Sequence, residues 1–165
     1  MEQDPGGEIG IMGREYPEYP IVGVSAIIFK DKAVLLVRRG QEPGKGRWSL
    51  PGGVVELGEG HLEALERELR EELSIKIEVG GLAGVFDKIF RDGKNRVRYH
   101  YVVVDYWGWL VQGEPAPASD VSEVKVVPLE ELEEFETDRA LKKIIRRAYH
   151  AWQQGTNNPD TNLLK

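Results

Sequence analysis

A group of carboxylates between residues 53 and 75 is the part of the sequence whose spacing could do chemistry. A glycine turn leads into a helical pattern that carries Glu68, Glu71 and Glu72. Residues three and four apart lie side by side on a helix, so these three side chains would lie together. Like charges at that spacing repel each other. The cluster therefore predicts a bound cation, and oxygen ligands favour Mg²⁺ or Mn²⁺.

An acidic helix face can also be ordinary solvated surface, with Arg67 and Arg70 offsetting its charge. The apolar pattern argues against that interpretation, because Glu68 and Glu72 lie next to a stripe of leucines. Such a stripe packs on a core. The carboxylates are therefore expected at the edge of the core, and the stripe consists of Leu62, Leu65, Leu69 and Leu73.

This segment resembles the Nudix box, which places a glycine, a glutamate, an Arg-Glu pair and a Glu-Glu pair at fixed spacing. The matching positions are Gly53, Glu59, Arg67, Glu68, Leu69, Glu71, Glu72 and Ile75. Ser74 stands where the family has glycine, at a helix exit that favours a left-handed cap. The resemblance covers roughly residues 19 to 148 and includes segments 43–53, 100–102 and 126–132. Within the family, the chain is most similar to small ADP-ribose pyrophosphatases and MutT-like proteins.

The resemblance implies an enzyme, a Mg²⁺-dependent (or Mn²⁺-dependent) hydrolase that cleaves the pyrophosphate bond of a nucleoside diphosphate linked to another group. The expected reaction converts ADP-ribose to AMP and ribose 5-phosphate. One alternative substrate is a nucleoside triphosphate, including oxidised dGTP. A second alternative is a non-catalytic module that senses nucleotides. The intact carboxylates and the absence of room for a second domain favour the enzyme.

The resemblance also implies roles for the residues of the box. Glu68, Glu71 and Glu72 would be metal ligands, together with the backbone carbonyl of Gly52. Glu71 could instead act as the base that accepts a proton from the attacking water. Arg67 would orient the carboxylates.

A further acid often precedes the last strand in this family, and two residues fall there, Asp120 and Glu123. Asp120 is the first choice, because its place six residues before Val126 often bears an acid. Each residue could equally be part of a polar loop.

Substrate contacts are expected from the end of the second strand and from a hairpin. Arg38 or Arg39 could bind phosphate, since a guanidinium suits that group, although the pair is also an ordinary strand end. Phe86 or Tyr99 could stack on a base, with packing in the core as the alternative.

Composition limits the remaining possibilities. A chain of 165 residues with net charge −6 and pI near 5.2 is expected to be a single domain that does not bind nucleic-acid polymers. It has no cysteine, no apolar run long enough for a membrane span and no basic secretory start, so a soluble cytoplasmic protein is expected. Related proteins are often dimers, and the sequence leaves a homodimer open. Residues 1–15 and 154–165 are expected to be flexible, on either side of one domain at 16–153.

The apolar periodicity predicts an α+β fold, and the resemblance specifies it as an α/β/α sandwich with a mixed β-sheet flanked by helices. A loop–helix–loop carries the box, with its helix at about 60–73. A second helix, capped by Thr137, is expected through Trp152. Strands are predicted at 21–29, 33–39, 75–79, 82–90, 96–109 and 124–127, with a short extended stretch at 48–56.

Overall fold

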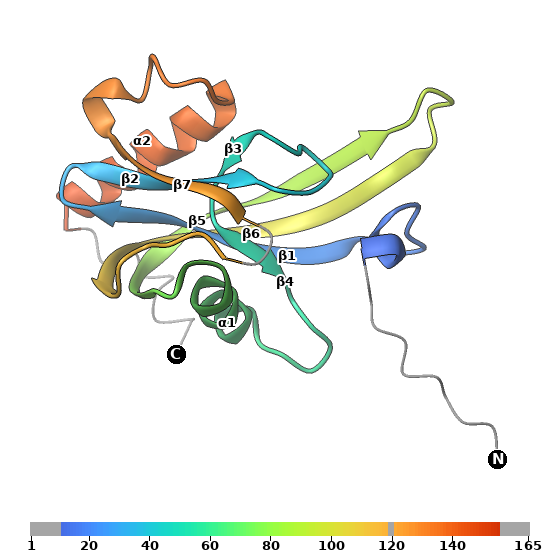
Figure 1. Ribbon diagram of the computed structural model, residues 1–165, viewed down its shortest axis with the longest axis horizontal. Helices are drawn as coiled ribbons and strands as arrows, with labels where there is room; N and C mark the ends of the chain where they lie inside the picture. Colours follow the sequence, from blue (N-terminus) through green and yellow to red (C-terminus); the bar gives the residue numbers. More distant parts are fainter. Residues whose placement is uncertain (1–10, 119–120, 156–165) are drawn as a thin grey trace.

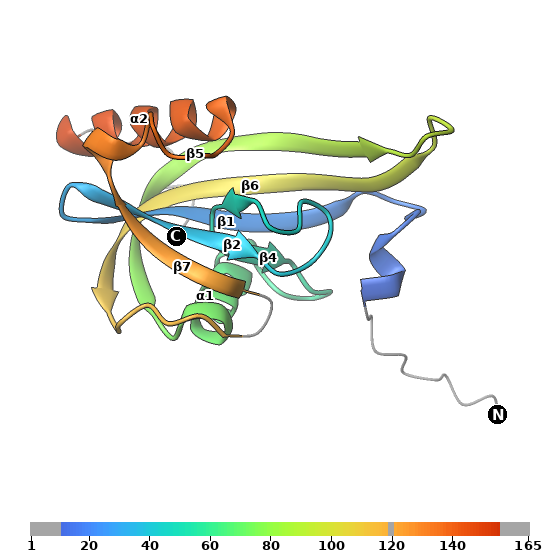
Figure 2. The same cartoon turned by 45° about the horizontal axis from the view of Figure 1, so that its top comes forward.

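The computed structural model describes residues 11–118 and 121–155. A mixed sheet lies between two helices, with α1 and α2 on opposite faces (Figures 1 and 2). This arrangement confirms the predicted α+β sandwich. In chain order the elements are η1 (Ile11–Arg14), β1 (Ile21–Lys30), β2 (Ala33–Arg39), β3 (Trp48–Ser49), β4 (Gly52–Val54), α1 (His61–Leu73), β5 (Lys76–Arg91), β6 (Val97–Gln112), β7 (Val121–Pro128), η2 (Leu129–Glu131) and α2 (Arg139–Gln153).

The central strand is β1, and the sheet is ordered β3-β2-β1-β6-β5. β1 runs parallel to β6 and antiparallel to β2 and β4, while β7 pairs with the other side of β2. Every residue from Gly23 to Phe29 is buried, as expected for a strand that is covered on both faces. None of the helices within the described ranges is long and apolar enough to cross a membrane.

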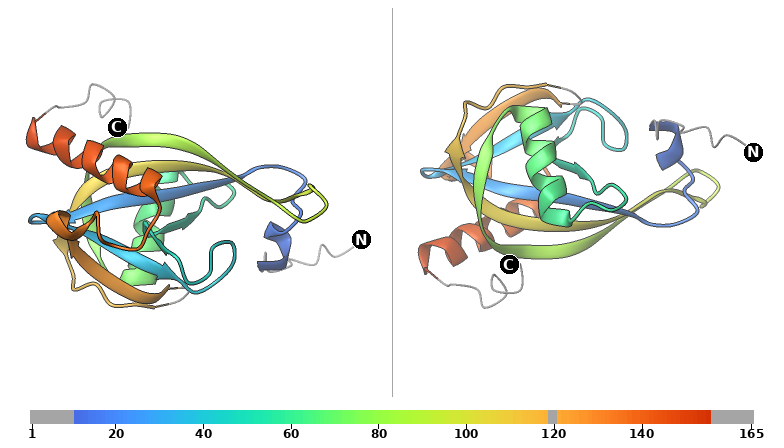
Figure 3. Two further views of the ribbon diagram at one scale, coloured as in Figure 1. Left: turned by 90° about the horizontal axis from the view of Figure 1, so that it is seen from above. Right: turned by 90° about the horizontal axis from the view of Figure 1, so that it is seen from below.

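Two hydrophobic cores divide the side chains of β1 by their alternation. On one face Val24, Ala26 and Ile28 pack with the leucines of α1. On the other face Ile27 and Phe29 pack with α2 through Ile144, Ile145 and Ala148. Figure 3 shows each helix covering its own side of the sheet. The stripe predicted for the box helix therefore sets the position of α1 on the sheet.

Several predicted boundaries were wrong. The strands expected at 75–79 and 82–90 form a single strand, β5, in which Gly80 and Ala83 are bulged out of register with β6. The cap of α2 is Asp138, which accepts a hydrogen bond from the Ala140 N–H at 2.7 Å. Thr137, the expected cap, instead donates its hydroxyl to the Trp48 carbonyl at 3.1 Å.

The expected flexible ends fall largely outside the described residues. Of residues 1–15, only 11–15 are described, and they contain η1. The Glu15 carboxylate pairs with Arg98 at 2.6 Å, and the Tyr16 N–H donates to the Arg98 carbonyl at 2.7 Å. The segment just before β1 is therefore attached to β6. At the other end, residues 154 and 155 are described and follow α2 directly.

Ser74 keeps the turn that the family builds with glycine. Its backbone is left-handed, with φ 56° and ψ 38°, and its N–H donates to the Arg70 carbonyl at 3.0 Å. A residue with a Cβ atom pays about 1–2 kcal/mol in that conformation. The cap is therefore formed at a cost that glycine would avoid.

We expect Ser74→Gly to stabilise the protein. Relief of the left-handed strain exceeds the extra entropy that glycine loses on folding, which leaves a net gain of about 0.5–1 kcal/mol. For a domain of this size the gain corresponds to a rise in Tm of about 1–4 °C. Calorimetric melting of both proteins would measure it, and an unchanged or lower Tm would show that Ser74 is unstrained.

Candidate active site

The carboxylates of α1 meet the glycine turn of β4. A Cβ atom on Gly53 would lie only 2.2 Å from the Glu68 carboxyl carbon, so Glu68 occupies the space that the glycine leaves. The Gly52 N–H donates to Glu72 at 3.3 Å. Gly52 has φ 156°, and a Cβ there would lie 2.0 Å from the Val24 carbonyl oxygen. Two glycines in sequence are therefore required for β4 to approach both β1 and α1.

Arg67 forms hydrogen bonds with several groups of the site. Its guanidinium donates to both oxygens of Glu59, at 2.7 and 3.0 Å, and to Glu68 at 2.8 Å. It also donates to Glu71 at 3.3 Å and to the Val54 carbonyl at 3.0 Å. Only 17% of its side chain is exposed. Arg67 thus binds three carboxylates and connects the helix α1 to the loop between β4 and α1.

The carboxyls around Arg67 differ in their electrostatics. The hydrogen bond from Arg67 lowers the pKa of Glu59 to about 2. Burial raises the pKa of Glu68, and the hydrogen bond and charge of Arg67 oppose that rise. Glu71 is more exposed, at 54% of its side chain, and its negative charge also raises the pKa of Glu68. Glu68 is therefore a carboxylate whose negative charge a cation would stabilise strongly.

The donor set fits a hard divalent ion. Glu68, Glu71, Glu72 and the Gly52 carbonyl offer only oxygen, which Mg²⁺ and Mn²⁺ prefer. In the conformation that the structure shows, no three acidic or histidine side chains of residues 11–118 and 121–155 form a ready-made cage. Glu68 and Glu71 are instead turned towards Arg67 through one oxygen each.

The two loop acids have different outcomes. Asp120 lies outside the described residues. The described part of its loop reaches α1, because the Ala118 N–H donates to the Glu72 carbonyl at 2.9 Å. Glu123 lies on β7 and forms an ion pair with Arg38 at 3.5 Å. Arg38, the residue with which Glu123 pairs, thus lies outside the box.

The structure brings together only some of the residues that were predicted to bind the substrate. Arg38 donates to the Gly46 carbonyl at 3.0 Å and Arg39 to the Pro43 carbonyl at 2.8 Å, so both hold the loop after β2. Tyr99 is 7% exposed and packs edge to face with Phe90, which indicates a packing role. Phe86 is 38% exposed and is the more accessible of the two aromatic candidates.

Sequence reasoning missed Arg14 and Tyr101. Burial raises the pKa of the Tyr101 hydroxyl, and the positive charges of Arg14 and Arg39, with a hydrogen bond from Arg14, oppose the rise. The charge of Arg14 also lowers the pKa of Glu68. The charges of two guanidiniums therefore act on Tyr101, and the charge of Arg14 also acts on Glu68. Only the basic side chain itself could have indicated Arg14, because its segment was expected to be flexible.

A buried acid on β6 lies on the other side of β1 from Gly52. Asp105 is 5% exposed and accepts a hydrogen bond from Ser25, the residue opposite Gly52 in the register of β1 and β4. Burial raises the pKa of Asp105, and the hydrogen bond from Ser25 opposes the rise. At pH values between the ordinary pKa of an aspartate and the raised pKa of Asp105, the folded protein binds the Asp105 proton more tightly than the unfolded chain does. The contribution of Asp105 to stability is therefore lost as the pH rises through its folded pKa.

We expect Asp105→Asn to have a higher free energy of unfolding than the wild type at pH 8. The amide keeps an acceptor for Ser25 without a buried charge, and the difference should vanish as the pH falls towards 4. Urea unfolding across this range measures it, with the exposed Glu66→Gln as control. A difference that does not depend on pH would show that folding leaves the titration of Asp105 unchanged.

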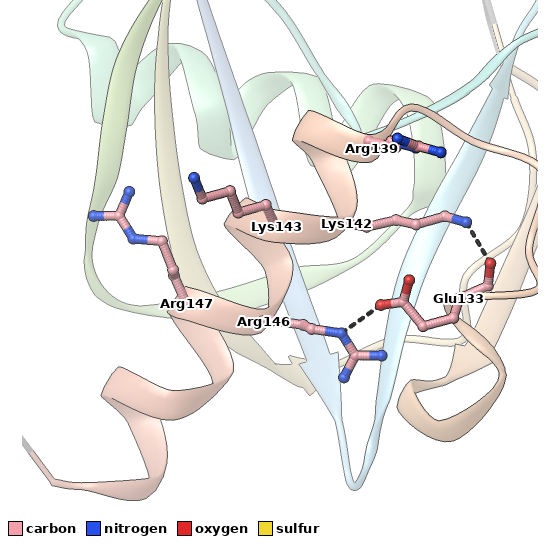
Figure 4. A pocket seen from close by; sticks show the side chains of 6 residues that line it. All are labelled: Glu133, Arg139, Lys142, Lys143, Arg146 and Arg147. Carbon is pink, nitrogen blue, oxygen red and sulfur yellow. Dashed lines mark hydrogen bonds and ion pairs between the residues drawn. The ribbon is translucent and has the colours of Figure 1, made fainter.

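A shallow hollow on the outer side of α2 is separate from this site. Figure 4 shows that it is lined by Glu133 and by basic side chains, with Arg146 bound to the Glu133 carboxylate at 2.7 Å. The basic residues are Arg139, Lys142, Lys143, Arg146 and Arg147. Because α1 and α2 cover opposite faces of the sheet, the carboxylates of the box do not reach this hollow.

Comparison with known proteins agrees with the fold and the box. A model of the NUDIX domain matches residues 20–148, and the chain belongs to the Nudix family. The fold and the site together define a Nudix pyrophosphohydrolase. The chain is 36% identical over 137 residues to the ADP-ribose pyrophosphatase of Methanocaldococcus jannaschii, which covers 83% of this chain and 77% of that protein.

Two further comparisons describe its place in the family. The crystal structure of a MutT Nudix hydrolase from Burkholderia pseudomallei matches with TM-score 0.67 and 32% identity, over 78% of this chain and 98% of that one. The CTP pyrophosphohydrolase of Escherichia coli is 48% identical over 58 residues, which are 34% of this chain and 43% of that protein.

Proposed function

We propose that the protein hydrolyses ADP-ribose to AMP and ribose 5-phosphate in the presence of Mg²⁺ or Mn²⁺. The observation that carries the proposal is the meeting of Glu68 and Glu72 with the Gly52–Gly53 turn, held in place by Arg67. The similarity to an ADP-ribose pyrophosphatase over most of both chains supports the choice of substrate.

Each residue of the proposed site has a separate role in the hydrolysis. Glu68, Glu71, Glu72 and the Gly52 carbonyl would hold the metal, which neutralises phosphate charge and acidifies water when bound. A water molecule adds to one phosphorus of the pyrophosphate, and the bond from that phosphorus to the bridging oxygen breaks. Asp120 is the proposed acceptor of the water proton, with Glu71 as the other candidate in the box. Arg67 keeps the carboxylates oriented throughout.

Positive charge on the side of η1 and β2 suits the rest of the substrate. The charges of Arg14 and Arg39 both act on the Tyr101 hydroxyl, and guanidinium groups bind phosphate oxygens in a fixed geometry. We assign them to the pyrophosphate. Phe86, exposed on β5, is the proposed surface for the adenine ring.

The alternative substrate is a nucleoside triphosphate, and the local similarity to a CTP pyrophosphohydrolase favours it. That similarity covers only a third of the chain, whereas substrate choice lies in loops outside the box. A module that senses nucleotides without cleaving them is disfavoured, because Glu68, Glu71 and Glu72 are all retained.

We expect Glu72→Gln to lose metal affinity and turnover while it keeps the fold. Loss of a partner that merely supports a ligand costs about 10–100-fold in affinity, so loss of a ligand should cost at least as much. Calorimetric titration with Mn²⁺ measures binding apart from catalysis. Glu66→Gln, an exposed position on the same helix, is the matched control. Affinity like that of the wild type in the Glu72 variant would remove Glu72 from the metal site.

We expect ADP-ribose to be cleaved with a higher kcat/KM than any nucleoside triphosphate. The measurement is a nucleotide panel with Mg²⁺, in which chromatography distinguishes AMP plus ribose 5-phosphate from a monophosphate plus pyrophosphate. A clear preference for oxidised dGTP or for CTP would establish the alternative substrate class.

A further inference from the structure

The outer edge of β5 exposes an unusual amount of apolar surface. β5 is the last strand of the sheet, and every residue from 85 to 91 is exposed. Successive side chains point to opposite faces, so the apolar side chains emerge on both faces of this stretch. The large ones are Val85 (57% exposed), Phe86 (38%), Ile89 (47%) and Phe90 (37%). An apolar edge of this kind is a template for pairing with another strand.

This edge carries few of the features that usually prevent pairing. Such features include prolines, bulges, a covering helix or loop and charged side chains. Of these, the stretch from 85 to 91 carries charges at Asp87, Lys88 and Arg91. β5 keeps its alternation from Gly84 to Arg91, because the shift near Phe90 places the extra residue, Arg98, on β6. Figure 3 shows β5 along the outside of the sheet. Within the described ranges, β6 is the strand that pairs with it.

We propose that this edge pairs with the same edge of a second copy of the chain, antiparallel and centred on Ile89. A two-fold axis normal to a sheet places the central residue opposite its own counterpart. Asp87 of each copy then lies opposite Arg91 of the other, on the face that carries Ile89. Lys88 lies opposite Phe90 on the other face. The two charge pairs flank an apolar centre, which makes the edge complementary to itself.

The charges select this centre over its neighbours. A centre at Asp87 would place aspartate opposite aspartate, and a centre at Lys88 would place lysine opposite lysine. Like charges directly opposite each other are destabilising. A centre at Phe90 would require Asp92 as the partner of Lys88, but Asp92 already accepts hydrogen bonds from Tyr16 and Arg96 at the hairpin tip.

The test is a charge reversal at Asp87 and Arg91, which lie outside the proposed active site. Analytical ultracentrifugation of the wild type at micromolar concentration should give a dimer. D87R places four cations at the two charge pairs and R91D places four anions there. Each variant alone should therefore sediment as a monomer, with its dimer dissociation constant raised at least tenfold. Circular dichroism checks that both variants are folded, and oligomeric state is measured without substrate, so the result is independent of the proposed activity.

Complementation tests the register. An equimolar mixture of D87R and R91D pairs arginines with aspartates at both positions, so it should form a heterodimer, and the double variant D87R/R91D should dimerise with itself. A monomeric wild type, or single variants that dimerise like the wild type, would overturn the proposal. The proposal would also be overturned if neither the mixture nor the double variant restored dimers, because the proposed pairing depends on this register.

Discussion

The site depends on the contact between the buried Arg67 guanidinium and the acids around it. Arg67 pairs with Glu56 and Glu59 in the loop and with Glu68 and Glu71 on the helix, so one positive charge offsets only part of the charge of four carboxylates. Breaking a largely buried pair from one side leaves an uncompensated charge, which is far more costly than the pair itself is favourable. The loop from β4 and the helix α1 are thus held together by the group that also aims the carboxylates. The excess of negative charge that remains beside Arg67 is the part that a divalent cation would complete.

The same contact depends on backbone that has no side chain. Glu68 can approach β4 only because Gly53 lacks a Cβ atom. In the same way, β4 can approach β1 only because Gly52 lacks a Cβ atom. On the far side of this turn, β1 is buried between two cores, with α1 on one face and α2 on the other. The cores fix α1 on the sheet, and the two glycines then bring its carboxylates into contact with β4. Packing and catalysis are therefore linked through a single short turn.

Periodicity predicted the elements that carry the site, and it failed where neighbouring signals compete. The leucine stripe located α1 and its carboxylates correctly, because a buried face leaves a strong 3.6-residue pattern. Gly80 and Gly81 resemble a break between strands, yet β5 continues through them beside β6, with Gly80 as a β-bulge. Thr137 and Asp138 are both good caps, and only tertiary contact with Trp48 decides between them. Arg14 left no periodic signal, since the long-range contacts of the neighbouring Glu15 and Tyr16, rather than local propensity, hold its segment.

The β5–β6 hairpin connects the parts that periodicity did not reveal. Near its tip, Asp92 binds the Tyr16 hydroxyl and Arg98 binds Glu15. These contacts hold the segment that begins with η1, and η1 ends at Arg14, whose charge acts on Glu68. Contacts thus run from the β5–β6 hairpin to the segment of η1, and the charge of Arg14 acts from there on Glu68. Any partner that restrains β5 would also restrain the hairpin tip and, through it, the position of Arg14. In the proposed reaction the box would supply the chemistry, whereas this hairpin would fix the position of Arg14.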